Sequence, residues 1–304
     1  MTDHPARSAE VPEWMGDIDP SQIGFPFKPD KSRYTKRIEI PYKETPLGPL
    51  YLDAYRPRDA EVSPLVVMIH GGGWRQGGRF EMGISRWAGY LASHGLAVAS
   101  IDYRLAPGTS YPDSFQDCID AIDWCVEHAG ELGADASRVG LWGDSAGGHL
   151  VLLVAASQTR PDFAGPRLRC GGERLAGVVA WYPPTDMLRL HNAEGRRAML
   201  GANTVRDFVG VAPEQDPQRW RDASPLEQAH AAMPPALILH GTRDLLVSHH
   251  HTVDFGKRLE ELGVPHELHI VENAVHGFER VAPDDRAKHL IERTRDYLRE
   301  KLGS

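Results

Sequence analysis

The feature that most constrains this chain is the pentapeptide Gly-Asp-Ser-Ala-Gly at residues 143–147. An apolar run typical of a buried strand, residues 139–142, precedes it, and an apolar run that can form a buried helix, residues 147–156, follows it. A G-x-S-x-G sequence in this setting forms a sharp turn that exposes the serine at a helix N-terminus, where negative charge is favoured. The pattern predicts that Ser145 is a nucleophile, although the pentapeptide alone is also consistent with an ordinary glycine-rich turn.

A second glycine-rich segment, His70–Trp74, reads His-Gly-Gly-Gly-Trp and follows the apolar, β-branched run 65–69. Glycines let backbone N–H groups approach a substrate closely. Acyl transfer needs such donors, because the attacked carbonyl oxygen becomes an oxyanion. We therefore predict an oxyanion hole formed by the amides of Gly72, Gly73 and Ala146. The alternative is a flexible glycine turn that binds nothing.

Two further polar residues each follow a strand-like run. Asp244 comes after residues 236–241, and His276 lies in the loop after a strand expected at 266–271. The chain order Ser145, Asp244, His276 is the order of a hydrolase triad on an open α/β sheet. His276 would take the serine proton, and Asp244 would orient the imidazole and stabilise its charged form. Each residue alone has a plain alternative, a loop-capping carboxylate or a surface histidine, so their joint placement carries the prediction.

Strands and helices are expected to alternate along most of the chain, which predicts an α/β fold with a mostly parallel central sheet and helices on both faces. Ligands of such a sheet bind beyond the carboxyl ends of its strands, where all three triad candidates fall. The first two strands are expected to form an antiparallel hairpin. We expect strands at about 37–42, 50–56, 65–70, 96–102, 138–143, 176–182, 235–240 and 266–272, and helices at about 80–94, 115–130, 147–157, 248–262 and 284–302.

These motifs together resemble the hormone-sensitive-lipase-like branch of the α/β-hydrolase superfamily, and within it the bacterial feruloyl and acetylxylan esterase-like group. The resemblance covers residues 65–278 and implies a serine carboxylesterase with no cofactor, without fixing the substrate. Members often form homodimers through a sheet edge or a terminal helix, and the residues leave open whether this chain does. The matching segments are His70–Trp74, Asp102–Pro107, Gly143–Gly148, His240–Asp244 and His276–Phe278, with Trp74–Gly78 and Gly147–Leu150 pointing to the esterase-like group.

The resemblance also implies a cap over the active site. We expect one α/β-hydrolase domain over 1–304, with its core at about 37–182 and 234–304 and its cap at about 1–36 and 183–233. The second cap segment is charged and contains no long apolar lid helix, which favours small to medium acyl groups. Trp74 adjoins the glycine loop and is the predicted substrate contact. Asp144 either braces the loop around His70 or is a surface carboxylate.

Composition excludes several classes of function. The 34 basic and 42 acidic residues give a net charge of −8, which argues against nucleic acid as a partner. No apolar stretch is long enough to span a membrane, and the first residues lack the pattern of a secretion signal. Cys118 and Cys125 lie seven residues apart on one helix face, too far for a disulfide, so core thiols and a cytoplasmic location are expected.

No metal site is expected, because the cysteines lack zinc spacing and the adjacent side chains of His249–His251 point in different directions. The predicted partner is a small-molecule ester. An amidase of the arylformamidase type resembles this family and stays open as an alternative. A receptor of the same fold that binds a small ligand without chemistry is a weaker alternative, because His276, Asp244 and the glycine loop are all present.

Overall fold

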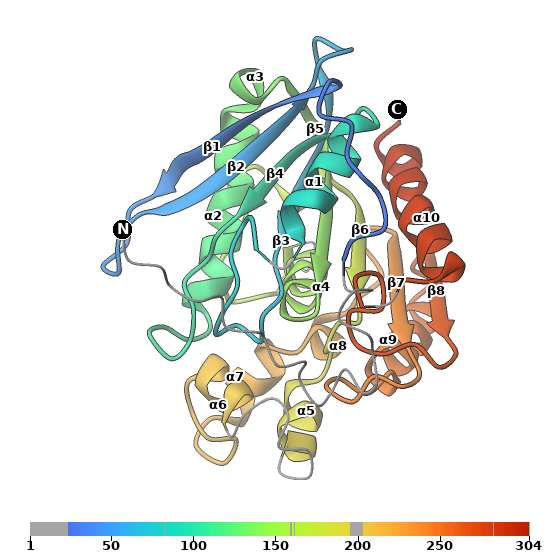
Figure 1. Ribbon diagram of the computed structural model, residues 1–304. Coiled ribbons are helices and arrows are strands. Elements are labelled where there is room, and N and C mark those ends of the chain that lie inside the picture. The colour runs from blue at the N-terminus through green and yellow to red at the C-terminus, as the bar shows by residue number, and fades with distance from the viewer. Residues whose placement is uncertain are drawn as a thin grey trace, which may run out of the picture.

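The computed structural model describes residues 24–81, 83–158, 160, 162–194, 203–281 and 283–303. These residues form one eight-stranded sheet in the order β1-β2-β4-β3-β5-β6-β7-β8 (Figure 1). β2 pairs antiparallel with both β1 and β4, and all the other neighbouring strands are parallel. The strands are β1 (Tyr34–Lys43), β2 (Leu50–Pro57), β3 (Ser63–Ile69), β4 (Ala97–Ile101), β5 (Ala134–Asp144), β6 (Leu175–Trp181), β7 (Ala236–Gly241) and β8 (His266–Val271).

Helices cover both faces of the sheet because the central strands are apolar on both sides. All residues of β4 and β7 are buried, as expected for strands inside a parallel sheet. α1 (Ile84–Ser93) and α10 (Asp285–Leu302) pack on one face with Val66, Met68 and Trp142. α2 (Asp113–Glu127), α4 (Ala146–Gln158) and α9 (His250–Glu261) pack on the other face. Two short elements, α3 (Ala129–Leu132) and the 3-10 turn Gly172–Arg174, complete the core.

The predicted strands and the five predicted helices are confirmed, with bounds that differ by a few residues. The first two strands form the expected antiparallel hairpin. β5 begins four residues earlier than expected, because Ala134 and Asp135 already pair with Ser63 and Pro64. Cys118 and Cys125 are buried free thiols of the core, as predicted. Among the described residues, no helix combines the length and apolar composition that crossing a membrane would require.

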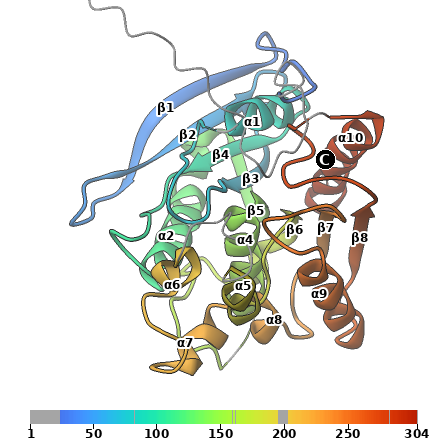
Figure 2. The same cartoon turned by 60° about the horizontal axis from the view of Figure 1, so that its bottom comes forward.

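The segment 183–233 is predicted from the sequence to be irregular or weakly helical. Its described part contains four short helices. They lie beyond the carboxyl ends of the strands, where the cap was expected (Figures 1 and 2). The helices are α5 (Met187–Glu194), α6 (Thr204–Val209), α7 (Pro217–Asp222) and α8 (Pro225–Gln228).

The N-terminal part of the predicted cap is only partly described. Phe25 packs on Trp87 of α1, with ring centroids 4.9 Å apart, and belongs to the core on that face. Residues 1–23 lie outside the described residues, so the contribution of the N-terminal segment to a cap stays a prediction.

Candidate active site

Ser145 occupies the single position between β5 and α4, and its backbone is left-handed, with φ of 53°. Its amide donates to the carbonyl oxygen of Trp181 on the neighbouring strand, at 2.8 Å. A Cβ atom on Gly147 would overlap the carbonyl oxygen of Ile69 on β3. The turn can therefore close only because position 147 has no side chain, which accounts for the second glycine of the motif.

The structure brings the three triad candidates together in hydrogen-bonding order. The Ser145 hydroxyl lies 3.0 Å from Nε2 of His276, and Nδ1 of His276 lies 2.6 Å from Oδ2 of Asp244. Because the carboxylate can only accept, Nδ1–H donates to Asp244, and Nε2 is left to accept from the serine hydroxyl. Asp244 follows β7 and His276 follows β8, so two neighbouring strands present both groups at the same sheet edge.

Asp244 is held by four donors, which fix both carboxylate oxygens. The amides of Leu246 and Val247 donate to Oδ1 at 2.9 and 2.8 Å, and Nε2 of His240 donates to Oδ2 at 3.1 Å beside His276. Burial alone would raise the pKa of Asp244, but the electrostatic interaction with His276 and the hydrogen bonds from both histidines hold that pKa well below its usual range. The carboxylate is thus ionised at neutral pH.

His240 was not predicted as part of the site. Its imidazole is fully buried, and its Nδ1 lies 2.7 Å from the hydroxyl oxygen of Thr252. The signal for it in the sequence is the position of His240 four residues before Asp244, across a tight turn.

The glycine loop lies beside the nucleophile, because β3 and β5 are neighbours and Ile69 pairs with Gly143. Gly72 and Gly73 have φ of 116° and 61°, a left-handed path that glycine adopts readily. Their amides donate no hydrogen bond to any residue that the structure describes. Ala146 is the first residue of α4, so its amide has no acceptor within the helix. These three N–H groups are therefore available to a ligand at Ser145.

Asp144 supports this loop, which confirms one of the two predicted alternatives for this residue. Its Oδ1 accepts from the Gly71 amide at 2.8 Å, and its side chain is 1% exposed, which excludes the surface reading. Oδ2 accepts from Nη2 of Arg280 at 2.8 Å. Asp144 therefore connects the glycine loop to a residue that follows His276 in the chain.

A buried charged cluster, Tyr182–Glu279–Arg280, adjoins the histidine and was missed from the sequence. The Tyr182 ring lies 4.4 Å from the His276 ring, and its hydroxyl donates to Oε1 of Glu279 at 2.6 Å. Burial raises the pKa of Glu279, although the neighbouring Arg280 cation opposes the shift. The cluster supports the loop that carries His276. In the sequence, Glu279 and Arg280 directly follow His276-Gly277-Phe278. Two adjacent charged residues form no recognisable motif, so the sequence does not single them out.

Trp74, the predicted substrate contact, is 2% exposed and packs inside the protein. Its indole stacks on Phe208 of α6 with centroids 4.6 Å apart, and its N–H donates to Nδ1 of His149 at 3.2 Å. His149 donates from Nε2 to the carbonyl oxygen of Ala223 at 2.8 Å, and burial lowers its pKa to about 4. Trp74 thus connects the glycine loop to α6 in the predicted cap segment, and its contact with substrate stays a prediction.

The histidine run at 249–251 does not converge on a point. His249 and His250 stack on each other, whereas His251 is buried and accepts from backbone amides. Within the described ranges, no group of three His, Cys, Asp or Glu side chains is placed to hold a metal ion.

The sheet order, the serine turn and the Ser-His-Asp arrangement define the α/β-hydrolase fold class. Within that class, the chain belongs to the BD-FAE family, whose model matches residues 52–259.

Similar proteins agree with this placement. The chain is 29% identical to esterase LipC of Mycobacterium tuberculosis over 81% of its own length but only 61% of that protein's length. It is 29% identical to an ethyl acetate hydrolase of Pseudomonas putida, over 91% of this chain and 86% of that protein. The solved structure of esterase Est2 of Thermogutta terrifontis with propionate bound is 26% identical, with a TM-score of 0.69 over 88% of this chain and 94% of that chain.

Proposed function

We propose that this protein is a serine carboxylesterase that hydrolyses small to medium acyl esters through an acyl-enzyme intermediate. The observation that carries the proposal is the continuous hydrogen-bonded line from Ser145 through His276 to Asp244. The relatives named as an esterase and an ethyl acetate hydrolase support the same reaction class.

In the first half of the reaction, the Ser145 hydroxyl gives its proton to Nε2 of His276 while Oγ bonds to the ester carbonyl carbon. The carbonyl oxygen takes up the negative charge and accepts hydrogen bonds from the amides of Gly72, Gly73 and Ala146. The bond from carbon to the alcohol oxygen then breaks. His276 gives the proton to the departing alcohol, and the acyl group stays on Oγ.

In the second half, a water molecule loses a proton to His276 and attacks the acyl carbon. The bond to Oγ breaks, the carboxylic acid leaves, and Ser145 recovers its proton. Asp244 stays ionised throughout and stabilises the imidazolium form of His276 in both halves. The low pKa of its carboxyl supports this role, because a protonated Asp244 would not stabilise that cation.

The proposed preference for small to medium acyl groups rests on the predicted cap. The described part of residues 183–233 supplies four short helices rather than one long apolar lid. The similarity to an ethyl acetate hydrolase and to a structure with propionate bound agrees with a small acyl group. A homodimer and a cytoplasmic location stay predictions.

The test is kcat/KM on p-nitrophenyl esters from acetate to dodecanoate, for the wild type and Ser145→Ala. We expect turnover by the wild type with an optimum at short to medium chains, and a loss of at least about 10⁴-fold in the variant. A folded wild type that hydrolyses none of these esters, or a variant that keeps its activity, would refute the proposal. The matching anilide series distinguishes an amidase from an esterase.

A further inference from the structure

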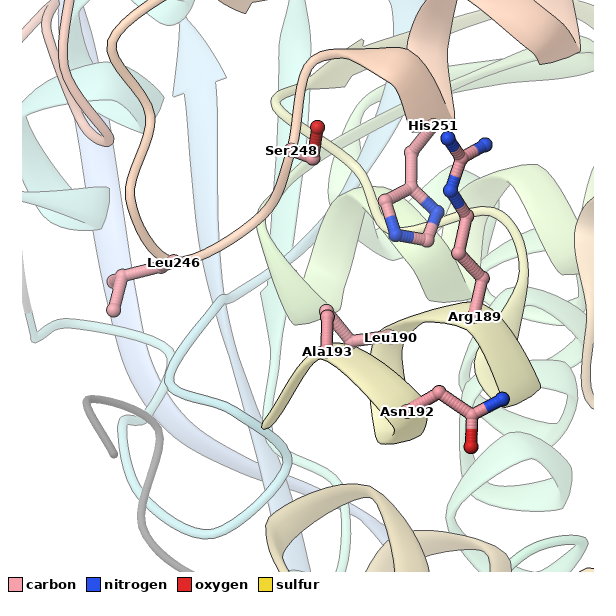
Figure 3. Close-up of a pocket in the computed structure, with 7 residues that line it drawn as sticks. All are labelled: Arg189, Leu190, Asn192, Ala193, Leu246, Ser248 and His251. Carbon is pink, nitrogen blue, oxygen red and sulfur yellow. The ribbon is translucent and has the colours of Figure 1, made fainter. Parts of the chain in front are cut away.

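A cavity of about 390 Å³ lies between α5 and the segment that follows Asp244 (Figure 3). This volume falls in the range of small-molecule sites. We call it the α5 cavity. Its described lining residues are Arg189, Leu190, Asn192, Ala193, Leu246, Ser248 and His251. None of them belongs to the predicted triad or oxyanion hole.

One buried donor points into the α5 cavity. His251 is 2% exposed, and its Nδ1 accepts from the amides of Thr185 and Asp186 at 3.2 and 3.3 Å. Because Nδ1 accepts, the ring proton of the neutral imidazole is on Nε2. Figure 3 shows the imidazole directed toward Leu190 and Ala193. No residue that the structure describes accepts a hydrogen bond from this Nε2–H group, so a ligand in the cavity would supply the missing acceptor.

The α5 cavity carries little net charge. Burial lowers the pKa of His251 to about 3, so the ring is neutral at neutral pH. The Arg189 guanidinium is paired with Asp254 at 2.5 Å, and Asn192 directs its amide away from His251 in Figure 3. The remaining lining residues are the apolar Leu190, Ala193 and Leu246 and the uncharged Ser248. Such a site suits an uncharged, mainly apolar group with one accepting oxygen better than an anion or a polyol.

The position of the α5 cavity suits the alcohol part of an ester better than the acyl part. His276 must protonate the leaving oxygen, so the alcohol part lies on the His276–Asp244 side of Ser145, away from the amides of Gly72 and Gly73. The segment that holds Asp244 continues directly into the cavity wall. The Leu246 amide bonds to the Asp244 carboxylate, and Leu246 itself lines the cavity.

We propose that the α5 cavity receives the alcohol part of the ester and prefers an uncharged, apolar alcohol whose single accepting oxygen bonds to Nε2–H of His251. This inference rests on the proposed esterase function and adds the class of alcohol that the site accepts.

The experiment uses two acetates of nearly equal shape, cyclohexyl acetate and oxan-4-yl acetate, which differ by one CH₂ replaced with an ether oxygen. We compare kcat/KM for the wild type and His251→Phe. Removing the donor should lower the ratio of oxan-4-yl to cyclohexyl acetate by about tenfold, because the ether oxygen would be buried without a partner. A ratio within twofold of the wild-type value would overturn the hydrogen bond.

A second variant fills the cavity and leaves His251 itself unchanged. Ala193→Phe should lower kcat/KM for cyclohexyl acetate at least about tenfold relative to methyl acetate. Leu188→Phe is the matched control on the same helix, because Leu188 is 44% exposed and does not line the cavity, and its ratio should equal that of the wild type. An unchanged ratio in Ala193→Phe would overturn the placement of the alcohol.

The acyl side is tested with methyl cyclohexanecarboxylate and methyl oxane-4-carboxylate. The ratio of their kcat/KM values should not respond to His251→Phe, and a tenfold response would assign the cavity to the acyl group instead.

Binding of oxan-4-ol to the wild type, followed by ligand-observed NMR, separates this inference from the proposed function. If no ester is hydrolysed, the esterase proposal fails, while oxan-4-ol binding that both variants weaken still supports the cavity. If oxan-4-ol does not bind and the kcat/KM ratios of the acetates are unchanged in both variants, the assignment of the α5 cavity is overturned.

Discussion

Arg280 donates a hydrogen bond from Nη2 to Oδ2 of Asp144 at 2.8 Å, across 136 positions of the sequence. The Asp144 side chain is 1% exposed and that of Arg280 is 12% exposed, so the pair is shielded from water. The other oxygen of Asp144 accepts from the Gly71 amide. The ion pair therefore joins the loop after His276 to the glycine loop through the residue that precedes the nucleophile.

Arg280→Met should destabilise the fold and slow the chemistry together. It would leave the buried Asp144 carboxylate without its cation, at an expected cost of about 3 kcal/mol in the free energy of unfolding. kcat should fall, because Asp144 holds the Gly71 amide and with it the neighbouring donors of the predicted oxyanion hole. Urea unfolding at pH 7 and ester kinetics measure the two effects.

Two further variants make that result interpretable. Arg280→Lys keeps a positive charge and should lose less stability than Arg280→Met. Asp144→Asn keeps an accepting oxygen for the Gly71 amide but removes the charge. The stability lost by the double variant Asp144→Asn/Arg280→Met should therefore be smaller than the sum of the losses of the two single variants. Strict additivity would show that the ion pair contributes nothing as a pair.

Asp244→Asn should abolish most activity while the chain stays folded. The amide can donate to Nδ1 of His276 and so favour the tautomer with its proton on Nε2, which cannot accept from Ser145. We expect kcat to fall about 10⁴-fold. Far-ultraviolet circular dichroism and the urea midpoint serve as controls for folding. A loss below tenfold would show that another group orients His276.

His149 should make the protein less stable in mild acid. Its pKa is lowered by burial from 6.5 to about 4, so above pH 6.5 both states carry a neutral ring and stability does not depend on it. Between pH 6.5 and about 4 the unfolded chain binds a proton that the folded chain does not, so stability falls as the pH falls. The loss over this window is on the order of 3 kcal/mol and ends below pH 4, where both states are protonated.

The measurement for His149 is the urea midpoint at pH 7, 6, 5 and 4 for the wild type and His149→Gln. The variant keeps an N–H group for the Ala223 carbonyl but has no ring to titrate. Its stability should therefore fall less steeply than that of the wild type. A residual slope is expected, since burial also lowers the pKa of His251, to about 3. Parallel curves for the two proteins would contradict the prediction.

The sequence predicts the sheet well because its signals are local. Apolar β-branched runs such as 65–69 and 236–241 lie inside a parallel sheet, and their polar neighbours fall at its carboxyl edge. The triad candidates could be found for the same reason, since each lies in the turn or loop that follows a strand. The sequence does not state the order of the strands in the sheet. That order brings Ser145, Asp244 and His276 to the same sheet edge.

The supporting residues could not be predicted in this way, because their partners are distant in the sequence and their types are common. Nothing in the local sequence around Arg280 points to Asp144, and nothing around Trp74 points to Phe208, 134 positions later. The described part of the predicted cap segment 183–233 has short helices with little periodicity. Its position depends on contacts such as the Trp74–Phe208 stack and the Arg75–Asp207 ion pair, at 3.2 Å, rather than on a pattern within it.

The glycines after Ser145 should respond very differently to the same substitution. A Cβ atom on Gly147 would overlap the carbonyl oxygen of Ile69 and lie 2.7 Å from that of His70. Both oxygens belong to the backbone of β3 and its following loop, and β3 is fixed by pairing with β4 and β5. Gly147→Ala should therefore cost more than about 3 kcal/mol of stability or displace the glycine loop and remove activity.

Gly148→Ala is the neighbouring comparison. Its Cβ would lie 3.1 Å from the Trp181 carbonyl oxygen, a contact that a shift of a few tenths of an ångström relieves, and alanine favours the helix by roughly 1 kcal/mol. We expect a net change within about 1 kcal/mol and retained activity. Gly130→Ala, where a Cβ meets nothing within 4 Å, controls for helix propensity alone. Urea unfolding and kcat on p-nitrophenyl acetate rank the three variants, and equal losses at 147 and 148 would show that the close approach to β3 does not shape the turn.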